Sequence, residues 1–453
     1  MQQLKRFKDI LAFSDEDKTY YAFQANTIQV AEISKEMWNS MLPYSLQDNT
    51  IPLATELHSP ESVLKDLETW NAETQEKVEA NTQSQSRKIH GLNININQIC
   101  NLKCTYCYAG GDGTFGEPVK NISVEKTLPQ IKFFMDRLQD GDIFSIKFVG
   151  GEPLLYTDGI LAVAEYVNEM AQVKRLKPQY SIVTNGTQIN DKNLKALISI
   201  KATVTVSCDG PPQIHDQFRK TKSGECSSKA VLEGIKRLVE HKSQLGGLQV
   251  SGVFGKHNMA LVEAYKFYRT YPFDTFKFSV EFNEADPQFN QIFQEQFSEI
   301  LSIAYESGGE TELRRIHEVN HYFTQMDEQT KVIHHCGAGI SNLAIDAKNR
   351  VYPCPMMVSN AQQEVSFNEK LIASLEQDFK ENLIEQNNCN NCWARFICGG
   401  GCMYVNNNIS GDLHKKSSTF CERTRFMITK TLSYYAKIRG EQKPHEGETH
   451  ETH

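Results

Sequence analysis

The feature that most constrains the fold is a regular alternation of strand-like and helix-like segments between residues 92 and 306. Parallel strands joined by helical crossovers form a sheet with helices on its faces, and the crossovers are right-handed. We therefore predict an α/β fold with six β-then-α units in a partial (β/α)6 barrel. The strand-like runs are 92–96, 143–149, 179–184, 202–207, 248–254 and 275–282, and the helix-like segments are 123–138, 157–171, 190–199, 227–243, 258–271 and 287–306.

Three closely spaced cysteines follow the first strand-like run. Cys100, Cys104 and Cys107 stand in the stretch CNLKCTYC. One short loop with this spacing can place three thiolates on three corners of a cubane iron–sulfur cluster and leave the fourth iron without a protein ligand. An iron with an open position can chelate a small molecule and pass it an electron. A zinc knuckle or buried free thiols are the structural alternatives.

A second motif, Gly150-Gly151-Glu152-Pro153, directly follows the second strand-like run. Two glycines let the backbone approach a ligand closely, and a carboxylate can accept hydrogen bonds from an ammonium group. The stretches TNGT and SCDGPP follow the third and fourth runs. Because α/β barrels place their active sites at the C-terminal ends of the strands, these positions indicate one shared ligand site.

The order of CNLKCTYC and GGEP resembles that of the radical S-adenosylmethionine (SAM) enzymes, whose TIM-like barrels are partly open. The resemblance implies that the three cysteines hold a [4Fe–4S] cluster whose open iron binds the amine and carboxylate of SAM. It also implies that Tyr106 lies near the adenine, that the GGEP motif binds the methionyl amine and that Arg219 pairs with a carboxylate. The implied SAM-binding residues are Tyr106, Gly150, Gly151, Glu152, Pro153, Thr184, Asn185, Ser207, Asp209 and Arg219.

Seven further cysteines lie beyond the barrel, more than one tetrahedral zinc site needs and one short of two. Their spacing resembles the signature of the SPASM extension, which is found in radical SAM peptide-modifying enzymes. The resemblance implies two auxiliary [4Fe–4S] clusters. One would be held by Cys389, Cys392, Cys398 and Cys421, and the other by Cys336, Cys354 and Cys402.

The chain departs from this signature in two places. Asn349 replaces the signature glycine before Cys354, but asparagine tolerates the left-handed conformation, so we expect the turn to survive. The stretch before Cys336 lacks the cysteine that would complete that auxiliary cluster. We predict an open iron there, able to take a substrate thiolate, unless His334, His335 or a distant residue fills the position. Both histidines are better explained as surface or packing groups.

We divide the chain into four segments. Strand-like runs followed by helix-like stretches near the N-terminus resemble the peptide-recognition domains that precede many peptide maturases and add a leader peptide as an edge strand. A plain packing extension is the alternative. The predicted segments are an N-terminal peptide-recognition-like domain and linker at 1–88, the partial barrel at 89–310, the SPASM domain at 311–438 and a disordered tail at 439–453.

The net charge of −8 argues against nucleic-acid and anionic-membrane partners, which favour basic surfaces. No apolar run approaches the ~20 residues of a membrane span, and the N-terminus lacks the pattern of a signal peptide. Iron–sulfur clusters need reduced thiols, which predicts a cytoplasmic location.

These features lead us to expect a peptide or protein maturase that forms a thioether between a cysteine sulfur and a carbon atom of a ribosomally made precursor. The resemblance implies hydrogen abstraction by a 5′-deoxyadenosyl radical and a flavodoxin- or ferredoxin-like electron donor. The stretch CTYCYAGGDGTFG and the cysteine-free N-terminal extension look most like ranthipeptide synthases and the maturation protein of quinohemoprotein amine dehydrogenase. No catalytic base is identified, and Glu281 is one candidate.

Four alternatives remain open. Anaerobic sulfatase-maturating enzymes carry an acidic base directly after the cysteine that matches Cys354, where this chain has Pro355. A peptide epimerase needs a spare thiol, and only Cys208 and Cys226 are left. A carbon–carbon crosslinking enzyme shares all of these motifs. The non-enzyme alternative is a binding protein stabilised by zinc or a cluster.

Overall fold

The computed structural model describes residues 3–14, 18–46, 60–75, 88–111, 113–115, 121–378 and 382–441. The chain folds into two units, each described here by itself. The first comprises residues 1–79, 290–335 and 382–453, and the second comprises 80–289 and 336–381.

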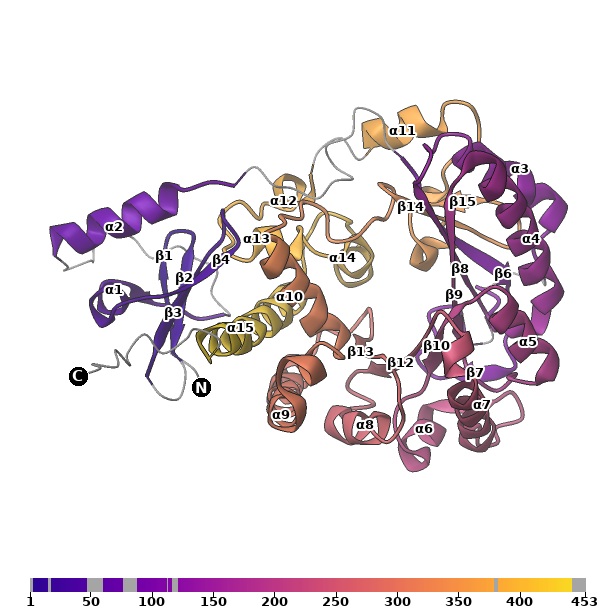
Figure 1. Cartoon of the computed structure of the whole chain (residues 1–453), viewed down its shortest axis with the longest axis horizontal. Coiled ribbons are helices and arrows are strands. Elements are labelled where there is room, and N and C mark those ends of the chain that lie inside the picture. The colour runs from indigo at the N-terminus through magenta and orange to yellow at the C-terminus, as the bar shows by residue number, and fades with distance from the viewer. Residues whose placement is uncertain are drawn as a thin grey trace, which may run out of the picture. The chain divides into compact units, whose positions relative to one another are not determined.

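The second unit is built on a sheet in the strand order β13-β12-β10-β9-β8-β6-β14-β15, seen in Figure 1. The six predicted strands are parallel to their neighbours. They are β6 (Gly91–Asn97), β8 (Ile143–Gly150), β9 (Lys177–Thr184), β10 (Thr203–Ser207), β12 (Gly247–Phe254) and β13 (Thr275–Val280). The predicted α/β fold is thereby confirmed.

Two strands that the periodicity did not reveal extend this sheet. β14 (Asn342–Ile345) runs parallel to β6, and β15 (Val351–Tyr352) pairs antiparallel with β14. Both come from the part of the chain that was assigned to the SPASM domain. They are short, which is why an alternating pattern could not identify them.

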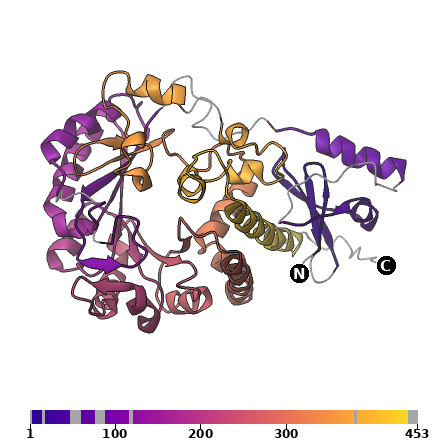
Figure 2. The ribbon, with the colours of Figure 1, turned by 180° about the vertical axis from the view of Figure 1, so that it is seen from behind.

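Helices cover one face of the sheet, as Figures 1 and 2 show. Along β8, Phe144, Ile146 and Phe148 are fully buried, whereas Ser145 and Lys147 between them are accessible. Because successive strand side chains point to opposite faces, the apolar face lies beneath the helices and the polar face lines the concave side. The covering helices are α3 (Val124–Met135), α4 (Thr157–Lys174), α5 (Asp191–Ser199), α6 (Pro212–Phe218), α7 (Ser228–Glu240) and α8 (Leu261–Tyr268).

The remaining elements of this unit are short. β7 (Leu102–Cys104) pairs antiparallel with β11 (Arg219–Thr221), a contact between segments distant in the sequence that was not predicted. The helix α11 (Leu371–Asp378) follows β15.

The first unit contains a five-stranded antiparallel sheet in the order β4-β3-β2-β1-β5. Phe7, Ile10, Trp38 and Leu67 form part of its core. The strands β1 and β5 were not predicted, whereas β2, β3 and β4 match the strand-like runs at 10–13, 20–23 and 28–33. The elements are β1 (Leu4–Phe7), β2 (Ile10–Ser14), β3 (Tyr20–Gln24), β4 (Gln29–Glu32), α1 (Lys35–Asn39), β5 (Leu42–Pro43) and α2 (Glu61–Ala72).

Helices make up the rest of the first unit. They are α9 (Pro287–Leu313), which starts in the second unit and is interrupted at Gly308 and Gly309, α10 (His317–Glu328), α12 (Leu383–Gln386), α13 (Arg395–Cys398), α14 (Met403–Ser410) and α15 (Ser418–Glu441). Within the described ranges, none of the helices combines the length and apolar composition that a membrane crossing requires.

The start of the predicted tail needs a correction. Helix α15 continues to Glu441, and Arg439 pairs with Glu310 at 2.7 Å and with Asp327 at 2.9 Å. These ion pairs hold a segment whose lack of apolar residues had suggested disorder. Residues 442–453 lie outside the described part of the chain.

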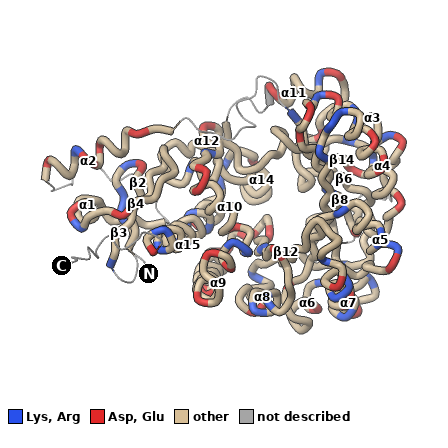
Figure 3. Tube along the Cα trace, viewed as in Figure 1, with Lys and Arg blue, Asp and Glu red and all other residues tan. Residues whose placement is uncertain are grey.

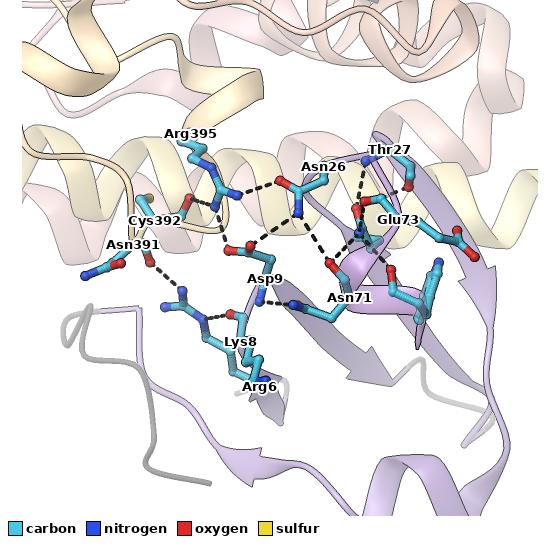
Figure 4. A network of polar contacts seen from close by, with 12 residues as sticks. Arg6, Lys8, Asp9, Asn26, Thr27, Asn71, Glu73, Asn391, Cys392 and Arg395 are labelled. Carbon is cyan, nitrogen blue, oxygen red and sulfur yellow. Dashed lines mark hydrogen bonds and ion pairs between the residues drawn. The ribbon is translucent and has the colours of Figure 1, made fainter. Parts of the chain in front are cut away.

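A polar network joins the N-terminal sheet to the cysteine-bearing segment of the same unit, as Figure 4 shows. The guanidinium of Arg395 donates to Asp9 Oδ1 at 2.6 Å, to Asn26 Oδ1 at 2.7 Å and to the carbonyl of Cys392 at 3.1 Å. Arg6 donates to the carbonyl of Asn391. The network therefore fixes the backbone on both sides of one cysteine.

We predict that Arg395→Met destabilises this unit by about 2–4 kcal/mol, because it leaves a largely buried Asp9 carboxylate and a backbone carbonyl without their charged donor. The midpoint of anaerobic thermal unfolding measures the effect. Lys8→Met, which removes an exposed pair with Glu68 in the same unit, should cost less than about 1 kcal/mol. Equal midpoints for the two variants would contradict the role assigned to Arg395.

Candidate active site

The loop that carries the first three cysteines begins where β6 ends. Burial chiefly, with a smaller effect of the neighbouring Cys104, raises the pKa of Cys100 to about 12. Burial also raises the pKa of Cys104, and Cys107 contributes in the same direction. The three thiols therefore lie close enough together to interact electrostatically.

Donor groups are directed at two of these sulfur atoms. The backbone N–H of Leu102 lies 3.4 Å and Asn185 Nδ2 lies 3.7 Å from Cys100 Sγ. Arg219 Nη1 lies 3.9 Å from Cys104 Sγ. Neighbouring buried thiols with N–H donors suit an iron–sulfur cluster, because metal binding favours deprotonated sulfur and offsets the cost of burying a thiolate.

The described part of the chain contains no group of three or more His, Cys, Asp or Glu side chains arranged around one metal-ion position. In a cubane cluster each thiolate binds a different iron, so its ligands are spread over the corners of the cluster.

The two glycines after β8 allow the cysteine loop to lie directly against the strand end. A Cβ atom on Gly151 would lie 2.1 Å from the carbonyl oxygen of Ile99, the residue before Cys100. Gly150 has a φ of +133°, and a Cβ there would lie 2.1 Å from Asn97 O. The glycines are therefore required by the protein's own backbone, in addition to any ligand.

The Glu152 carboxylate holds strands together. Its oxygens accept hydrogen bonds from Thr184 Oγ1 at 2.8 Å, from the backbone N–H of Asn185 at 2.7 Å and from that of Leu154 at 3.0 Å. The side chain is fully buried, and this burial raises its pKa to about 7. Both carboxylate oxygens therefore accept hydrogen bonds from the protein itself. Two of the donors, Thr184 and Asn185, belong to the TNGT turn, so Glu152 positions this turn beside the cysteine loop. The sequence did not indicate this role.

Tyr106, Asp209 and Arg219 form a second connected group. The Tyr106 hydroxyl donates to Asp209 Oδ2, and Arg219 Nε lies 3.1 Å from the same oxygen. The Arg219 guanidinium also lies 5.3 Å from the centre of the Tyr106 ring. Arg219 thus has a carboxylate partner within the protein, brought to the cysteine loop by the pairing of β11 with β7.

The structure brings the predicted SAM-binding residues to one edge of the sheet. Thr184 and Ser207 are the last residues of β9 and β10, and Gly150 is the last residue of β8. Asn185 also donates to Asn101 in the cysteine loop at 2.8 Å. Asn101 and Asn97 were not predicted to contribute. Only the proximity of Asn101 to a cysteine could have indicated it.

Four of the C-terminal cysteines come together in the first unit. Burial raises the pKa of Cys398 well above its usual range, and Cys421, Cys392 and Cys389 each add to this effect. Three consecutive glycines with left-handed backbone follow Cys398 and let the chain turn toward Cys402. The four thiols therefore form one electrostatically coupled group, the same four that the SPASM resemblance assigns to one cluster.

The other three C-terminal cysteines are divided between the units. Cys336 and Cys354 belong to the second unit, where Gly339 donates its backbone N–H to Pro353 O at 3.2 Å and brings their flanking residues together. Cys402 belongs to the first unit, where it precedes α14. Their joint ligation of one cluster stays a prediction.

The turn before Cys354 survives the loss of the signature glycine, as predicted. Asn349 adopts a left-handed conformation with a φ of +63°. Its side-chain amide donates to Thr127 Oγ1 at 2.7 Å.

His335 is engaged within the protein. Its Nδ1 lies 2.9 Å from the carbonyl oxygen of Cys398, its ring packs against Phe420, and burial lowers its pKa. His334 is buried. The contacts of His335 and the burial of His334 favour the packing interpretation.

Residues 94–268 match the family model of the radical SAM superfamily. This part of the chain is a radical SAM domain. A cysteine-type anaerobic sulfatase-maturating enzyme of Clostridium novyi (strain NT) is 23% identical to it over 370 residues, covering 75% of this chain and 94% of that protein.

Solved structures share the fold of this chain. The structure of native anSMEcpe with bound AdoMet and Cp18Cys peptide covers 78% of this chain and 99% of its own, with a TM-score of 0.62 and 18% identity. SuiB of Streptococcus suis bound to the precursor peptide SuiA covers 89% of this chain and 96% of its own, with a TM-score of 0.50 and 14% identity.

We predict that Gly151→Ala lowers the iron content of the anaerobically reconstituted enzyme, because the added methyl group must displace the backbone at Ile99 and with it Cys100. Iron analysis and the charge-transfer absorption of the cluster measure the loss. Gly141→Ala is the matched control, since a Cβ there meets no atom within 4 Å although its φ is also positive. Normal iron content in Gly151→Ala would contradict the proposed fit.

Proposed function

We propose that this radical SAM enzyme is a SPASM-type maturase that forms an intrapeptide thioether in a ribosomally made peptide or protein. Its cofactors are SAM, a radical SAM [4Fe–4S] cluster and two auxiliary [4Fe–4S] clusters. The observation that supports thioether formation most is that Cys389, Cys392, Cys398 and Cys421 come together as a set of four, which suffices for one cluster. By the SPASM resemblance only three cysteines, Cys336, Cys354 and Cys402, are then left for the second cluster, which would be one ligand short. The missing ligand leaves a place for a substrate thiolate.

When bound, the reduced radical SAM cluster and SAM supply a 5′-deoxyadenosyl radical that removes a hydrogen atom from a substrate carbon. Formation of the carbon–sulfur bond then releases one proton from the substrate thiol and one electron. SAM is the oxidant overall and becomes methionine and 5′-deoxyadenosine, so the product has lost two hydrogen atoms. The protein holds the substrate thiol close to the substrate carbon and provides a group that accepts the released proton.

Two cysteines outside the predicted clusters bear on the epimerase alternative. Cys208 is 1% exposed, donates to Gly210 O and has a pKa that burial raises to about 12. Cys226 lies at the surface in the turn that follows β11. Neither position favours a thiol that returns a hydrogen atom to a substrate radical at the strand ends.

The sulfatase-maturase reaction is the second candidate, because relatives with that name align over most of this chain. Pro355 still occupies the position at which that family has its acidic base. Experiment therefore has to distinguish thioether formation from the sulfatase-maturase reaction. A cytoplasmic location and a flavodoxin- or ferredoxin-like electron donor suit either reaction.

Glu281 is our candidate for the proton acceptor. It directly follows β13, and its backbone N–H donates to Phe254 O at 2.9 Å, which places it at the same end of the sheet as the cysteine loop. Its Oε1 atom is buried and makes no hydrogen bond within the described residues. Burial raises its pKa, His257 and Lys256 lower it, and Glu284 and Asp209 raise it.

We predict that Glu281→Gln slows product formation by at least about tenfold while 5′-deoxyadenosine still forms, because only the proton step is lost. The wild-type rate should rise with pH through the raised pKa of Glu281, and this rise should be missing in the variant. Glu263→Gln, an exposed acid on α8, is the control. A variant with the wild-type pH profile would exclude Glu281 as the acceptor.

The proposed function is tested by sequencing the genes beside that of the enzyme and using any small cysteine-bearing peptide or protein encoded there as the substrate. After anaerobic reaction, we expect a product that has lost two hydrogen atoms and no longer reacts with a thiol reagent, with one sulfur–carbon bond found by tandem mass spectrometry. A formylglycine residue would establish the sulfatase-maturase reaction instead. An unchanged mass with inverted stereochemistry would establish epimerisation.

A further inference from the structure

The four neighbouring cysteines of the first unit are named here the four-cysteine site. They are Cys389, Cys392, Cys398 and Cys421. Two buried arginines, Arg6 on β1 and Arg425 on α15, belong to the same unit. Figure 3 draws the lysine and arginine positions of the N-terminal sheet and of α15 in blue.

Within the described residues, neither arginine donates to an acidic side chain. Arg6 is 1% exposed and Arg425 is 6% exposed. Arg6 donates to the backbone carbonyl of Lys8 at 2.7 Å and to that of Asn391. Arg425 Nε donates to the backbone carbonyl of Leu46 at 2.9 Å. Arg6 Nη1 is buried and makes no hydrogen bond in this part of the structure.

Arg6 lies beside the segment that carries Cys392. It donates to the carbonyl of Asn391, the residue before this cysteine, as Figure 4 shows. Its guanidinium also lies 5.4 Å from the centre of the Tyr44 ring. The Tyr44 hydroxyl accepts a hydrogen bond at 3.1 Å from Nε1 of Trp393, the residue after the cysteine. Both chain neighbours of Cys392 are therefore joined to the surroundings of Arg6.

Arg425 stands one helical turn after Cys421 on α15, a spacing that places two side chains on the same face of a helix. Burial raises the pKa of Cys421, and Arg425 opposes this shift more than Lys416 does. Lys416 donates to the carbonyl of Asn388, next to Cys389, at 2.7 Å. Because Lys416 is exposed, water and salt screen its charge more than that of Arg425.

Buried charges in proteins are normally paired. Arg395 follows this rule, since its guanidinium lies 2.6 Å from Asp9 Oδ1. Burial lowers the pKa of Arg6, and Tyr44, Cys392 and Asp9 oppose this shift in that order. A cluster bound to four thiolates is anionic, so it would supply the counter-charge that Arg6 and Arg425 lack.

We propose that Arg6 and Arg425 are the counter-charges of an iron–sulfur cluster at the four-cysteine site and that they raise its reduction potential. The proposal rests on this cluster of the proposed function but not on the thioether reaction. Reduction adds a negative charge to the cluster, so buried cations stabilise the reduced form more than the oxidised form. Through Arg6, the N-terminal sheet then helps to decide how readily this auxiliary cluster accepts an electron.

The test is an anaerobic redox titration of the full chain, followed by electron paramagnetic resonance. Alanine at the other six predicted ligands leaves only the four-cysteine site, which should retain about four irons per chain. These six ligands are Cys100, Cys104, Cys107, Cys336, Cys354 and Cys402. The absence of bound iron from this background would overturn the cluster itself.

In this background, Arg6→Met should lower the ratio of reduced to oxidised cluster at a fixed potential at least about tenfold. For a one-electron couple this equals a midpoint about 59 mV more negative. Arg425→Met should act in the same direction. It is an independent measurement, because Arg425 bonds to Leu46 and not to the cysteine segment, and it decides the question if Arg6→Met binds no iron. Arg6→Lys keeps the charge and should recover most of the wild-type ratio.

Two controls separate charge from structure. Lys8→Met removes an exposed cation close to Arg6 in the sequence and should leave the midpoint unchanged. Tyr44→Phe removes the hydrogen bond to Trp393 without changing a charge, and it should also leave the midpoint unchanged. A shift in either control as large as that of Arg6→Met would overturn the assignment to buried charge.

Unchanged midpoints in both arginine-to-methionine variants, with about four irons bound, would overturn the proposal. A midpoint in Arg6→Lys as low as that in Arg6→Met would overturn the role of the charge at this position. Failure of the wild-type enzyme to form a thioether would leave all of these potentials unchanged. The counter-charge proposal and the proposed reaction therefore fail separately.

Discussion

The central constraint on this structure is that neighbouring cysteine thiols are held together where burial disfavours their ionised form. Burial raises the pKa of Cys100 and of Cys104; Cys104 adds to the shift of Cys100, and Cys107 adds to that of Cys104. Iron offsets this cost by binding the deprotonated sulfur. The protein holds the cysteine loop in place. Gly151 lets this loop pack against the end of β8, Glu152 accepts hydrogen bonds from the turn after β9, and Arg219 lies close to Cys104.

The first unit also holds neighbouring cysteine thiols together, but other residues fix their positions. Burial raises the pKa of Cys389 and of Cys398, and the neighbouring thiols of Cys392 and Cys421 add to both shifts. Here Arg395 and Arg6 hold the backbone of the cysteine segment to the N-terminal sheet. The N-terminal sheet therefore supports the backbone of the segment that carries these cysteines.

The sequence predicted the barrel well because its strands are long and alternate strictly, as in β12. It missed β1, β5, β7, β11, β14 and β15, which are too short for periodicity and are set by tertiary pairing. Cysteine spacing predicted which thiols of the first unit meet. It did not predict that the Glu152 carboxylate is occupied by the protein's own donors or that Asp209 is the partner of Arg219, because these contacts join residues distant in the sequence.

The account requires that three sulfur atoms leave one iron free to bind and reduce SAM. The most direct measurement is the formation of 5′-deoxyadenosine from SAM by the anaerobically reconstituted enzyme under a strong reductant. We predict that the wild-type enzyme forms it and that a variant with alanine at Cys100, Cys104 and Cys107 does not, although its auxiliary clusters remain. Absence of the nucleoside from a wild-type enzyme with all of its iron bound would contradict the account.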